Sequence, residues 1–295
     1  MEPWYISVME YRDVVRDVLS DEKLHRFTAA TLNESMRYLG FSEALISEFL
    51  HNLNNLDVPA FIEKHKSELE DIELGHFFRE LVPEYFSTYV VPEVPEKGKI
   101  LDLGCGLGTL LGRLVARGTN RALVGIDIKA SPEWESLERE NVRMEVIKED
   151  AFLPFLENEQ PDIVTATWVF HHMEYDEQER YLRSLYAALK EGAAVVVLED
   201  SYAQTLSPES GEVRYEAFME LSPDERLKVM GALDWIANRI FSMRTTMPVP
   251  FAYRTLEDWK RLFEEVGFTV TKTRFLGFPE NRDVNTPQSV LVAHK

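Results

Sequence analysis

A glycine-rich turn follows a short apolar run near residue 100. Asp102 precedes a turn with glycines at alternate positions, which are Gly104, Gly106 and Gly108. Glycine lets a backbone bend sharply and approach a ligand closely, because no Cβ intervenes. A dinucleotide site needs its third glycine one position later, where this chain has Thr109, so the spacing argues against a bound pyrophosphate. A carboxylate beside the turn instead suits a cationic ligand.

Acidic residues also follow the next two apolar runs. Asp127 comes directly after the run 122–126, and Asp150 follows the run 142–147. A carboxylate at a strand end can accept hydrogen bonds from both hydroxyls of a ribose, and Asp150 could accept one from the amino group of an adenine. Capping of a helix N-terminus is the alternative interpretation of each carboxylate.

Two histidines and an aspartate provide candidates for acid–base chemistry. His171 and His172 lie just past the run 162–167, and Asp200 lies at the end of the run 194–198. An unperturbed imidazole titrates near neutral pH, so either histidine could act as a general base, with Asp200 orienting an acceptor or acting as the base. The alternatives are packing or capping roles and a solvated strand end. A metal bound by these three residues is a further alternative, and we predict that no metal is bound.

A single cysteine, Cys105, lies inside the glycine turn. It excludes a disulfide within the chain and a cysteine-rich zinc cluster. A catalytic thiol needs exposure and a lowered pKa, and no neighbouring residue in the sequence supplies a base. We therefore interpret Cys105 as a small structural residue of the turn.

The elements that must position these groups form a β-α-β rhythm from residue 99 onward. Short apolar runs alternate with amphipathic stretches, which predicts a parallel sheet flanked by helices. The strands are expected at 100–103, 122–126, 142–147, 162–167, 194–198, 268–275 and 289–293, and helices at 110–116, 177–189, 223–241 and 255–266. In a parallel sheet the carboxyl ends of these strands lie at one edge.

In this order the segments resemble the class I S-adenosylmethionine-dependent methyltransferases. Residues 100–108 resemble the family's first motif, 125–127 its ribose motif, 150–151 its adenine motif, and 161–172 its fourth-strand motif, while 190–192 fit the approach to the fifth strand. The resemblance covers roughly residues 96–200, with a weaker agreement in the order of elements to 295. It implies a seven-stranded, mostly parallel α/β sheet with flanking helices, and S-adenosylmethionine as the cofactor.

The resemblance also implies a set of cofactor-binding residues. Arg79 and Tyr85 would lie near the methionine end of the cofactor, because the helix before the first strand passes that end in the family. The full set is Asp102, Gly104, Cys105, Gly106, Gly108, Asp127, Ile128, Asp150, Ala151 and Thr167, together with Arg79 and Tyr85.

Two regions outside the sheet are predicted to be helical. Residues 1–95 carry helical apolar patterns at 11–19, 30–53, 59–69 and 72–89, and Pro92, Pro95 and Gly98 then punctuate the chain. We expect a helical cap or lid over 1–95 and a methyltransferase domain over 96–295. A helical insertion over about 202–252 follows the fifth strand. Whether the first region is a lid or a dimer interface stays open.

Composition restricts the partners. The 295 residues carry a formal net charge of −19, which disfavours a nucleic acid, since binding phosphates relies on Lys and Arg. No run approaches the roughly 20 apolar residues that span a bilayer, and the N-terminus lacks a signal-peptide pattern. We therefore expect a cytoplasmic protein without a membrane partner, and the sequence leaves the oligomeric state open.

The expected activity is methyl transfer to oxygen, nitrogen or carbon of a small molecule in an enclosed site. The helical cap and the insertion favour such a site. A protein acceptor is the alternative, since an acidic enzyme can bind a basic segment. An inactive binding protein is a third hypothesis, which the intact set of acidic and glycine residues argues against. RNA is further disfavoured because Ala166, Thr167, Trp168 and Val169 stand where base-methylating families carry an N/D-P-P-Y/F motif.

Overall fold

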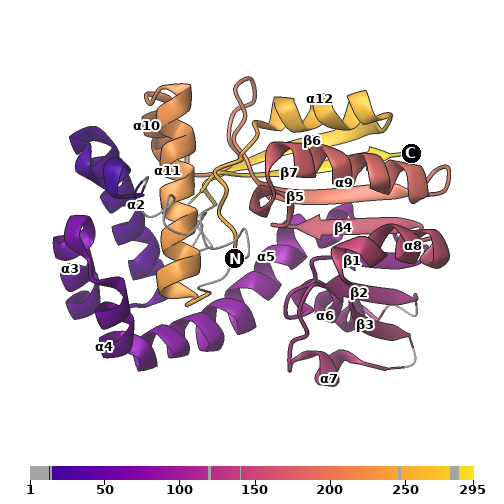
Figure 1. Cartoon of the computed structure of the whole chain (residues 1–295), viewed down its shortest axis with the longest axis horizontal. Helices are drawn as coiled ribbons and strands as arrows, with labels where there is room; N and C mark the ends of the chain where they lie inside the picture. The colour runs from indigo at the N-terminus through magenta and orange to yellow at the C-terminus, as the bar shows by residue number, and fades with distance from the viewer. Residues whose placement is uncertain (1–12, 14, 119–120, 140, 245–246, 280–285) are drawn as a thin grey trace.

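A seven-stranded sheet is the centre of the fold (Figure 1). The structure is a computed structural model that describes residues 13, 15–118, 121–139, 141–244, 247–279 and 286–295. The strands are β1 (Ile100–Leu103), β2 (Leu123–Asp127), β3 (Val142–Val146), β4 (Ile163–Thr167), β5 (Ala194–Asp200), β6 (Thr269–Gly277) and β7 (Gln288–His294). All seven predicted strands are confirmed to within two residues at either end.

The strand order creates one crevice at the edge where the strands end. The order is β3-β2-β1-β4-β5-β7-β6, with the first five strands parallel and β7 antiparallel to both of its neighbours. The chain runs outward from β1 in both directions, and β1 pairs with β4 so that Leu103 lies beside Ala166. Ligands of open α/β sheets bind where the strand order reverses in this way. The predicted mostly parallel sheet is confirmed.

Helices cover both faces of the sheet, because neighbouring strand residues point to opposite sides. Leu101 packs in a core with α8 (Glu149–Glu159), α9 (Tyr175–Ala188) and α12 (Leu256–Val266). Ile100, one residue earlier, packs in the other core, which includes α6 (Thr109–Ala116) and the short α7 (Trp134–Leu137). A turn of 3-10 helix, η4 (Phe170–His172), follows β4.

The N-terminal region is helical, as predicted, but it is divided differently. It contains α2 (Glu22–Leu39), α3 (Glu43–Asn52), η1 (Leu53–Asn55), α4 (Val58–Glu70), the π-helix η2 (Asp71–Leu81), α5 (Val82–Tyr89) and η3 (Val91–Glu93). The helical pattern over 30–53 is divided between α2 and α3. Gly40 adopts a φ of 88° and ends α2, and the Ser42 side chain then caps α3.

The insertion after β5 contains α10 (Glu212–Met219), α11 (Pro223–Ile236) and the π-helix η5 (Ala237–Phe241). Ser222 and Glu225 form a capping box that starts α11. In η5 the Ser242 N–H donates to the carbonyl of Ala237, five residues earlier, over 2.8 Å. Helix α11 contacts α2, so the insertion and the N-terminal helices lie together beside the sheet (Figure 1).

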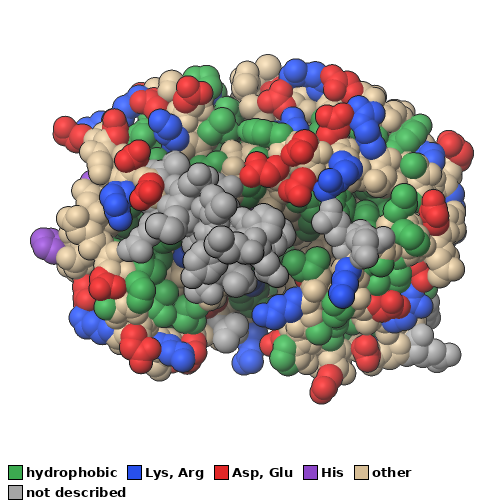
Figure 2. Space-filling model, viewed as in Figure 1, with side chains coloured by type: hydrophobic (Ala, Val, Ile, Leu, Met, Phe, Trp, Pro, Cys, Tyr) green, Lys and Arg blue, Asp and Glu red, His purple; other side chains and the backbone are tan. Residues whose placement is uncertain are grey.

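The surface is polar. On the face that Figure 2 shows, Lys and Arg side chains lie among Asp and Glu side chains, with hydrophobic side chains between them. Within the described residues, the helices are too short or too polar to cross a membrane.

Candidate active site

The glycine turn lies at the end of β1 and needs its glycines for two different reasons. Gly104, Gly106 and Gly108 have φ angles of 64°, 52° and 79°, a region that other residues adopt at a cost. A Cβ at Gly104 would lie 2.6 Å from Cγ2 of Val169, so packing excludes a side chain there. A Cβ at Gly106 would meet no atom within 4 Å, although its backbone lines a cavity. The backbone of Gly106 is therefore open to a ligand.

Asp127, at the end of β2, positions this turn. Its Oδ2 accepts a hydrogen bond from the N–H of Gly106 over 2.9 Å, and its Oδ1 accepts one from the N–H of Lys129 over 3.2 Å. Trp134 Nε1 donates to the carbonyl of Gly106 over 2.8 Å. Each carboxylate oxygen of Asp127 keeps a further lone pair. The next residue, Ile128, has an apolar side chain that is 77% exposed.

Asp102 is buried beneath the turn. Burial raises its pKa to about 7, with a smaller upward contribution from the charge of Asp127. The Oγ1 hydroxyl of Thr165 donates to Asp102 Oδ1 over 2.6 Å, which acts in the opposite direction. The Cys105 thiol is also buried, and burial raises its pKa. The thiol therefore stays protonated, which supports the structural interpretation of Cys105.

The chain turns sharply where β4 ends. Trp168 has a φ of 56°, which is rare for a bulky residue and clusters at functional sites. Its indole Nε1 donates to Oε1 of Gln288 over 2.5 Å, and its ring lies 5.0 Å from that of Phe86. The Gln288 amide also donates to Asp200 Oδ1. Gln288 of β7 therefore connects the ends of β4 and β5.

Glu199, buried at the end of β5, organises the turn that carries both histidines. Its Oε1 accepts from the backbone N–H groups of Val169 and Phe170 over 2.9 and 2.7 Å, and its Oε2 accepts from Nδ1 of His171 over 2.6 Å. Burial alone would lower the pKa of His171. The negative charges of Glu199, Asp200 and Asp234 outweigh burial and raise it to about 10. His171 is thus a cation at neutral pH.

His172 has the opposite protonation state. Its Nδ1 lies 2.7 Å from the carbonyl oxygen of Pro248. A carbonyl oxygen only accepts hydrogen bonds, so Nδ1 carries the proton and donates it. Burial, followed by the positive charge of His171, lowers the pKa of His172 well below its ordinary value. His172 is therefore neutral at pH 7, and its Nε2 carries a lone pair.

Asp234 of α11 brings a further carboxylate to the histidines. It accepts from Nδ2 of Asn238 over 2.6 Å and from the hydroxyl of Tyr253 over 2.7 Å. Burial raises its pKa to about 6. One ligand atom from each of His171, His172 and Asp234 lies within 4.8 Å of the other two. A divalent cation could bind at such a spacing. The same three side chains also make ordinary hydrogen bonds to Glu199, Pro248, Asn238 and Tyr253, which need no cation.

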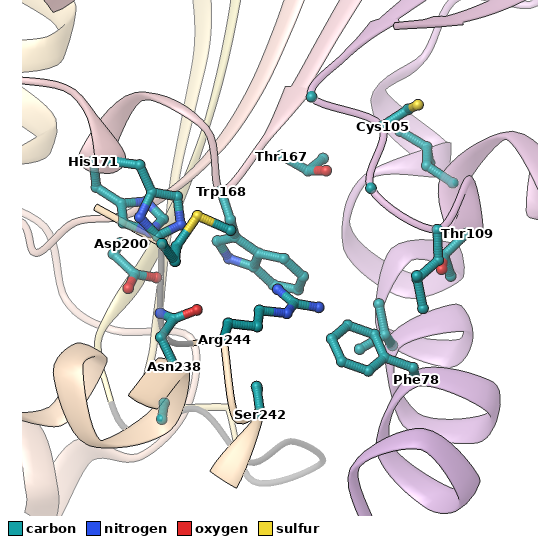
Figure 3. Close-up of a pocket in the computed structure, with 18 of the residues that line it drawn as sticks. Phe78, Cys105, Thr109, Thr167, Trp168, His171, Asp200, Asn238, Ser242 and Arg244 are labelled. Carbon is teal, nitrogen blue, oxygen red and sulfur yellow. The ribbon is translucent and has the colours of Figure 1, made fainter. Parts of the chain in front are cut away.

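A single cavity of about 220 Å³ joins these groups. Figure 3 shows His171, Asp200 and Asn238 on one side and Cys105 and Thr109 on the other. The lining residues are Phe77, Phe78, Val82 and Phe86 from the N-terminal region, Asp102, Gly104, Cys105, Gly106, Leu107, Thr109, Leu110, Asp127, Thr167, Trp168, His171, His172, Asp200 and Thr286 from the sheet domain, and Asp234, Ala237, Asn238, Ser242, Arg244 and Met247 from the insertion.

The structure brings most of the predicted site residues to this cavity, but not all. Among them, Asp102, Gly104, Cys105, Gly106, Asp127, Thr167, His171, His172 and Asp200 line it. Gly108, Ile128 and Ala151 lie outside the lining, and the side chain of Asp150, at the start of α8, is outside the described part of the structure.

The two residues expected near the methionine end, Arg79 and Tyr85, do not line the cavity. Arg79 is exposed, and Tyr85 is fully buried with its ring 4.6 Å from that of Tyr89. Phe78 and Phe86, on the same stretch of helix, line the cavity instead.

Sequence reasoning missed two contributors to the site and did not pair a third with its partner. Glu199 closes the same strand as the predicted Asp200, and in the structure it is the partner of His171. Asp234 and Phe78 come from helices whose apolar patterns resemble ordinary core. An acidic residue within such an apolar pattern is the one signal that could have pointed to Asp234.

Residues 73–273 match the model of a family described as a methyltransferase domain. The chain is 25% identical over 203 residues to an uncharacterized methyltransferase of Anoxybacillus flavithermus, an alignment that covers 68% of this chain and 81% of that protein. It is 29% identical over 206 residues to an uncharacterized methyltransferase of Bacillus mycoides, covering 66% of this chain and 82% of that protein.

Two solved structures are also similar to this chain. A SAM-dependent methyltransferase from Archaeoglobus fulgidus has a TM-score of 0.48 and 16% identity, covering 78% of this chain and 100% of that chain. The 1,6-didemethyltoxoflavin-N1-methyltransferase of Burkholderia thailandensis has a TM-score of 0.47 and 14% identity, covering 83% and 89%. The matched range 73–273 of the family includes the glycine turn, Asp127, both histidines and Asp200.

Proposed function

Because the chain belongs to the methyltransferase domain family, as a class I S-adenosylmethionine-dependent methyltransferase, we propose that it methylates a small molecule bound in the cavity at the edge of the sheet. The observation that carries this proposal is the continuity of the cavity. Gly106 and Asp127 line one part of it, and His171, His172 and Asp200 line another. A methyl donor and an acceptor bound there would be neighbours.

The residues around Gly106 and Asp127, in one part of the cavity, fit the cofactor. The open backbone at Gly106 accommodates close approach, and Asp127 has lone pairs left for the ribose hydroxyls. The exposed side chain of Ile128 would flank the adenine, and Asp102 would attract the ammonium group. Of the other residues that the family resemblance implies, Gly104, Cys105 and Thr167 line this cavity. Contacts of Gly108, Asp150, Ala151, Arg79 and Tyr85 with the cofactor stay predictions. S-adenosylmethionine supplies an electrophilic methyl group when bound.

The walls of the cavity support a small acceptor. Phe77, Phe78 and Val82 come from the N-terminal region, while Asn238 and Met247 come from the insertion. These two regions pack on each other through α2 and α11. Walls from two separate parts of the chain enclose a ligand and exclude water, which strengthens electrostatic interactions inside.

His172 would remove the proton of a protonated acceptor. Its Nδ1 donates to Pro248, so Nε2 is the atom with the free lone pair, and the ring lines the cavity. The positive charge of His171 lowers the pKa of His172 and thereby preserves its neutral form. His171 itself is protonated and would donate a hydrogen bond rather than accept a proton. Asp200 would orient the acceptor.

The experiment is a transfer assay with methyl-tritiated S-adenosylmethionine. The protein is incubated with a cell extract separated into molecules below 1 kDa and proteins. The proposal expects enzyme-dependent label in the small-molecule fraction and binding of S-adenosylhomocysteine by calorimetry. Label in the protein fraction alone would establish the protein acceptor instead. A protein that does not bind S-adenosylhomocysteine would overturn the proposed activity altogether.

A further inference from the structure

The cavity contains an arginine whose charge has no adjacent counter-ion. Arg244 follows η5, lines the cavity and is partly buried. Among the residues that the structure describes, no carboxylate lies within ion-pair distance of its guanidinium, and no acceptor receives a hydrogen bond from it. The ring centre of Phe78 lies 4.7 Å from its guanidinium carbon. The five N–H donors of this side chain are thus available to a ligand.

The backbone that carries Arg244 is well fixed. Its N–H donates to the carbonyl of Asn238 over 2.7 Å, and its own carbonyl accepts from Nη1 of the buried Arg239 over 2.6 Å. Stacking on Phe78 restricts the side chain. Figure 3 shows the guanidinium in the middle of the cavity, between Trp168 and Phe78. Groups fixed in advance bind a ligand with less loss of entropy.

The acids around Arg244 attract it without pairing with it. Glu73 accepts a hydrogen bond from Ser242, and Asp127 accepts two backbone hydrogen bonds. Both act on Arg244 only as more distant charges. A desolvated cation is costly when no anion contacts it, so this arrangement is best satisfied by an anion that arrives with a ligand. A guanidinium matches a carboxylate with two parallel hydrogen bonds.

We propose that Arg244 binds the carboxylate of a ligand in this cavity. The inference rests on the proposed function, because methyl transfer requires two ligands in this cavity and each of them could carry a carboxylate. One is the carboxylate on the methionine part of the cofactor, and the other would belong to an acceptor that is itself a carboxylic acid. The remaining ionisable residues of the cavity are mostly acidic, among them Asp127 and Asp200. They would repel a carboxylate at other positions. The other cation of the lining, His171, already pairs with Glu199, so Arg244 determines where the carboxylate lies.

The first arm of the test concerns the cofactor. Affinities of wild type and Arg244→Gln are measured by calorimetry for S-adenosylhomocysteine and for 5′-methylthioadenosine, which lacks the amino acid part. If Arg244 binds the cofactor carboxylate, the variant binds S-adenosylhomocysteine about 10- to 100-fold more weakly and 5′-methylthioadenosine equally well. Arg244→Lys restores part of the affinity, because it keeps the charge but not the planar fork.

The second arm concerns the acceptor. With S-adenosylhomocysteine saturating, binding of 4-hydroxybenzoate is compared with that of the neutral 4-hydroxybenzamide. If Arg244 binds the acceptor, wild type prefers the acid and Arg244→Gln loses this preference, while the cofactor affinities stay unchanged. Arg183→Gln, an exposed arginine on α9, controls for the loss of one positive charge, and thermal melts confirm folding.

The inference is overturned if Arg244→Gln leaves the affinity for S-adenosylhomocysteine unchanged and shows the same relative affinity for 4-hydroxybenzoate and 4-hydroxybenzamide as wild type. Wild type that binds neither S-adenosylhomocysteine nor 5′-methylthioadenosine would instead overturn the proposed function. The two failures are therefore distinguishable.

Discussion

Glu199 accepts a hydrogen bond from Nδ1 of His171 over 2.6 Å, with both side chains almost completely buried. The same carboxylate accepts the backbone N–H groups of Val169 and Phe170. One side chain of β5 therefore sets both the path of the chain after β4 and the charge of an imidazole in the cavity. Local structure and acid–base chemistry depend on the same carboxylate.

Replacement of this carboxylate is expected to destabilise the protein in a pH-dependent way. Glu199→Gln removes one partner of a buried ion pair and should cost about 3–5 kcal/mol in the free energy of unfolding. The folded-state pKa of His171 is about 10, above the ordinary 6.5. The stabilisation is therefore complete below pH 6.5 and is lost as the pH rises through 10. Denaturant unfolding of wild type and variant should differ most at pH 6.5 and progressively less toward pH 10. Glu191→Gln, at an exposed position, is the control, and a pH-independent difference would contradict the charge of His171.

His172→Asn should separate catalysis from binding. The amide nitrogen of Asn can donate to Pro248 as Nδ1 does, but no group replaces Nε2. The expected result is a turnover about 10²- to 10⁴-fold lower, with unchanged affinity for S-adenosylhomocysteine. His51→Asn, on the exposed surface of α3, should behave as wild type. Turnover of the wild type that is abolished by EDTA and restored by a divalent cation would assign proton removal to a metal and refute the role of Nε2.

The fall of turnover at low pH provides a second test of His172. Because its pKa is lowered well below 6.5, the neutral base should persist as the pH falls from 8 to 6. Turnover at saturating substrate should therefore show no loss that titrates near pH 6.5. Asp102 and Asp234 also titrate in this range, with pKa values of about 7 and about 6. A loss near pH 6.5 that persists in both Asp102→Asn and Asp234→Asn would therefore contradict the lowered pKa of His172.

Gly104→Ala and Gly106→Ala should fail in different ways. Each alanine would adopt a positive φ, which costs about 1–2 kcal/mol. At Gly104 the added Cβ would also lie 2.6 Å from Val169. This overpacking should lower the free energy of unfolding by about 1–3 kcal/mol more. At Gly106 the Cβ would enter open space, so Gly106→Ala should melt at a higher temperature than Gly104→Ala yet bind S-adenosylhomocysteine weakly. Equal binding by Gly106→Ala and wild type would exclude close approach of the cofactor at this backbone.

Asp102→Asn should change how stability varies with pH. Burial raises the pKa of Asp102 to about 7 from 3.8. Between these pH values the folded state retains a proton that the unfolded chain has lost, so wild-type stability declines as the pH rises. The variant lacks this decline, and its unfolding free energy relative to wild type should increase from pH 4 to pH 7. Asp127→Ala should instead weaken S-adenosylhomocysteine binding, because it removes the proposed acceptor of the ribose hydroxyls. Glu135→Ala on exposed α7 serves as control for both.

The sequence predicts the parts of the site that depend on local pattern. The glycine turn, Asp127 and the two histidines each lie directly after a strand, and a parallel sheet aligns those strand ends whatever surrounds them. The protonation state of His172 could not be predicted, because it depends on the carbonyl of Pro248, 76 residues away. Asp234 and Arg244 also depend on how the insertion packs on the N-terminal helices.

Some elements lacked a clear local signal. Helix α8 occupies the segment that carries Asp150, and Pro154 inside it obscures the helical pattern. Arg79 and Phe78 are consecutive on one helix, so their side chains point roughly 100° apart. The orientation of the helix about its axis therefore decides which of them meets a ligand. Apolar periodicity indicates the buried side of a helix only approximately.

The π-helix η5 has a consequence for how this chain tolerates insertions and deletions. A π-turn contains one residue more than an α-turn over the same length, and η5 lies between α11 and Arg244. Deleting a single residue from 237–241 would restore α-helical hydrogen bonding, and the backbone that follows would keep its orientation, because the π-turn holds the extra residue within the same length. Deleting a residue from the regular helix α11 would instead rotate everything after it by about 100° and turn Arg244 away from the cavity. Segment 237–241 is therefore the place in this insertion where the chain could lose one residue and still present Arg244 to a ligand.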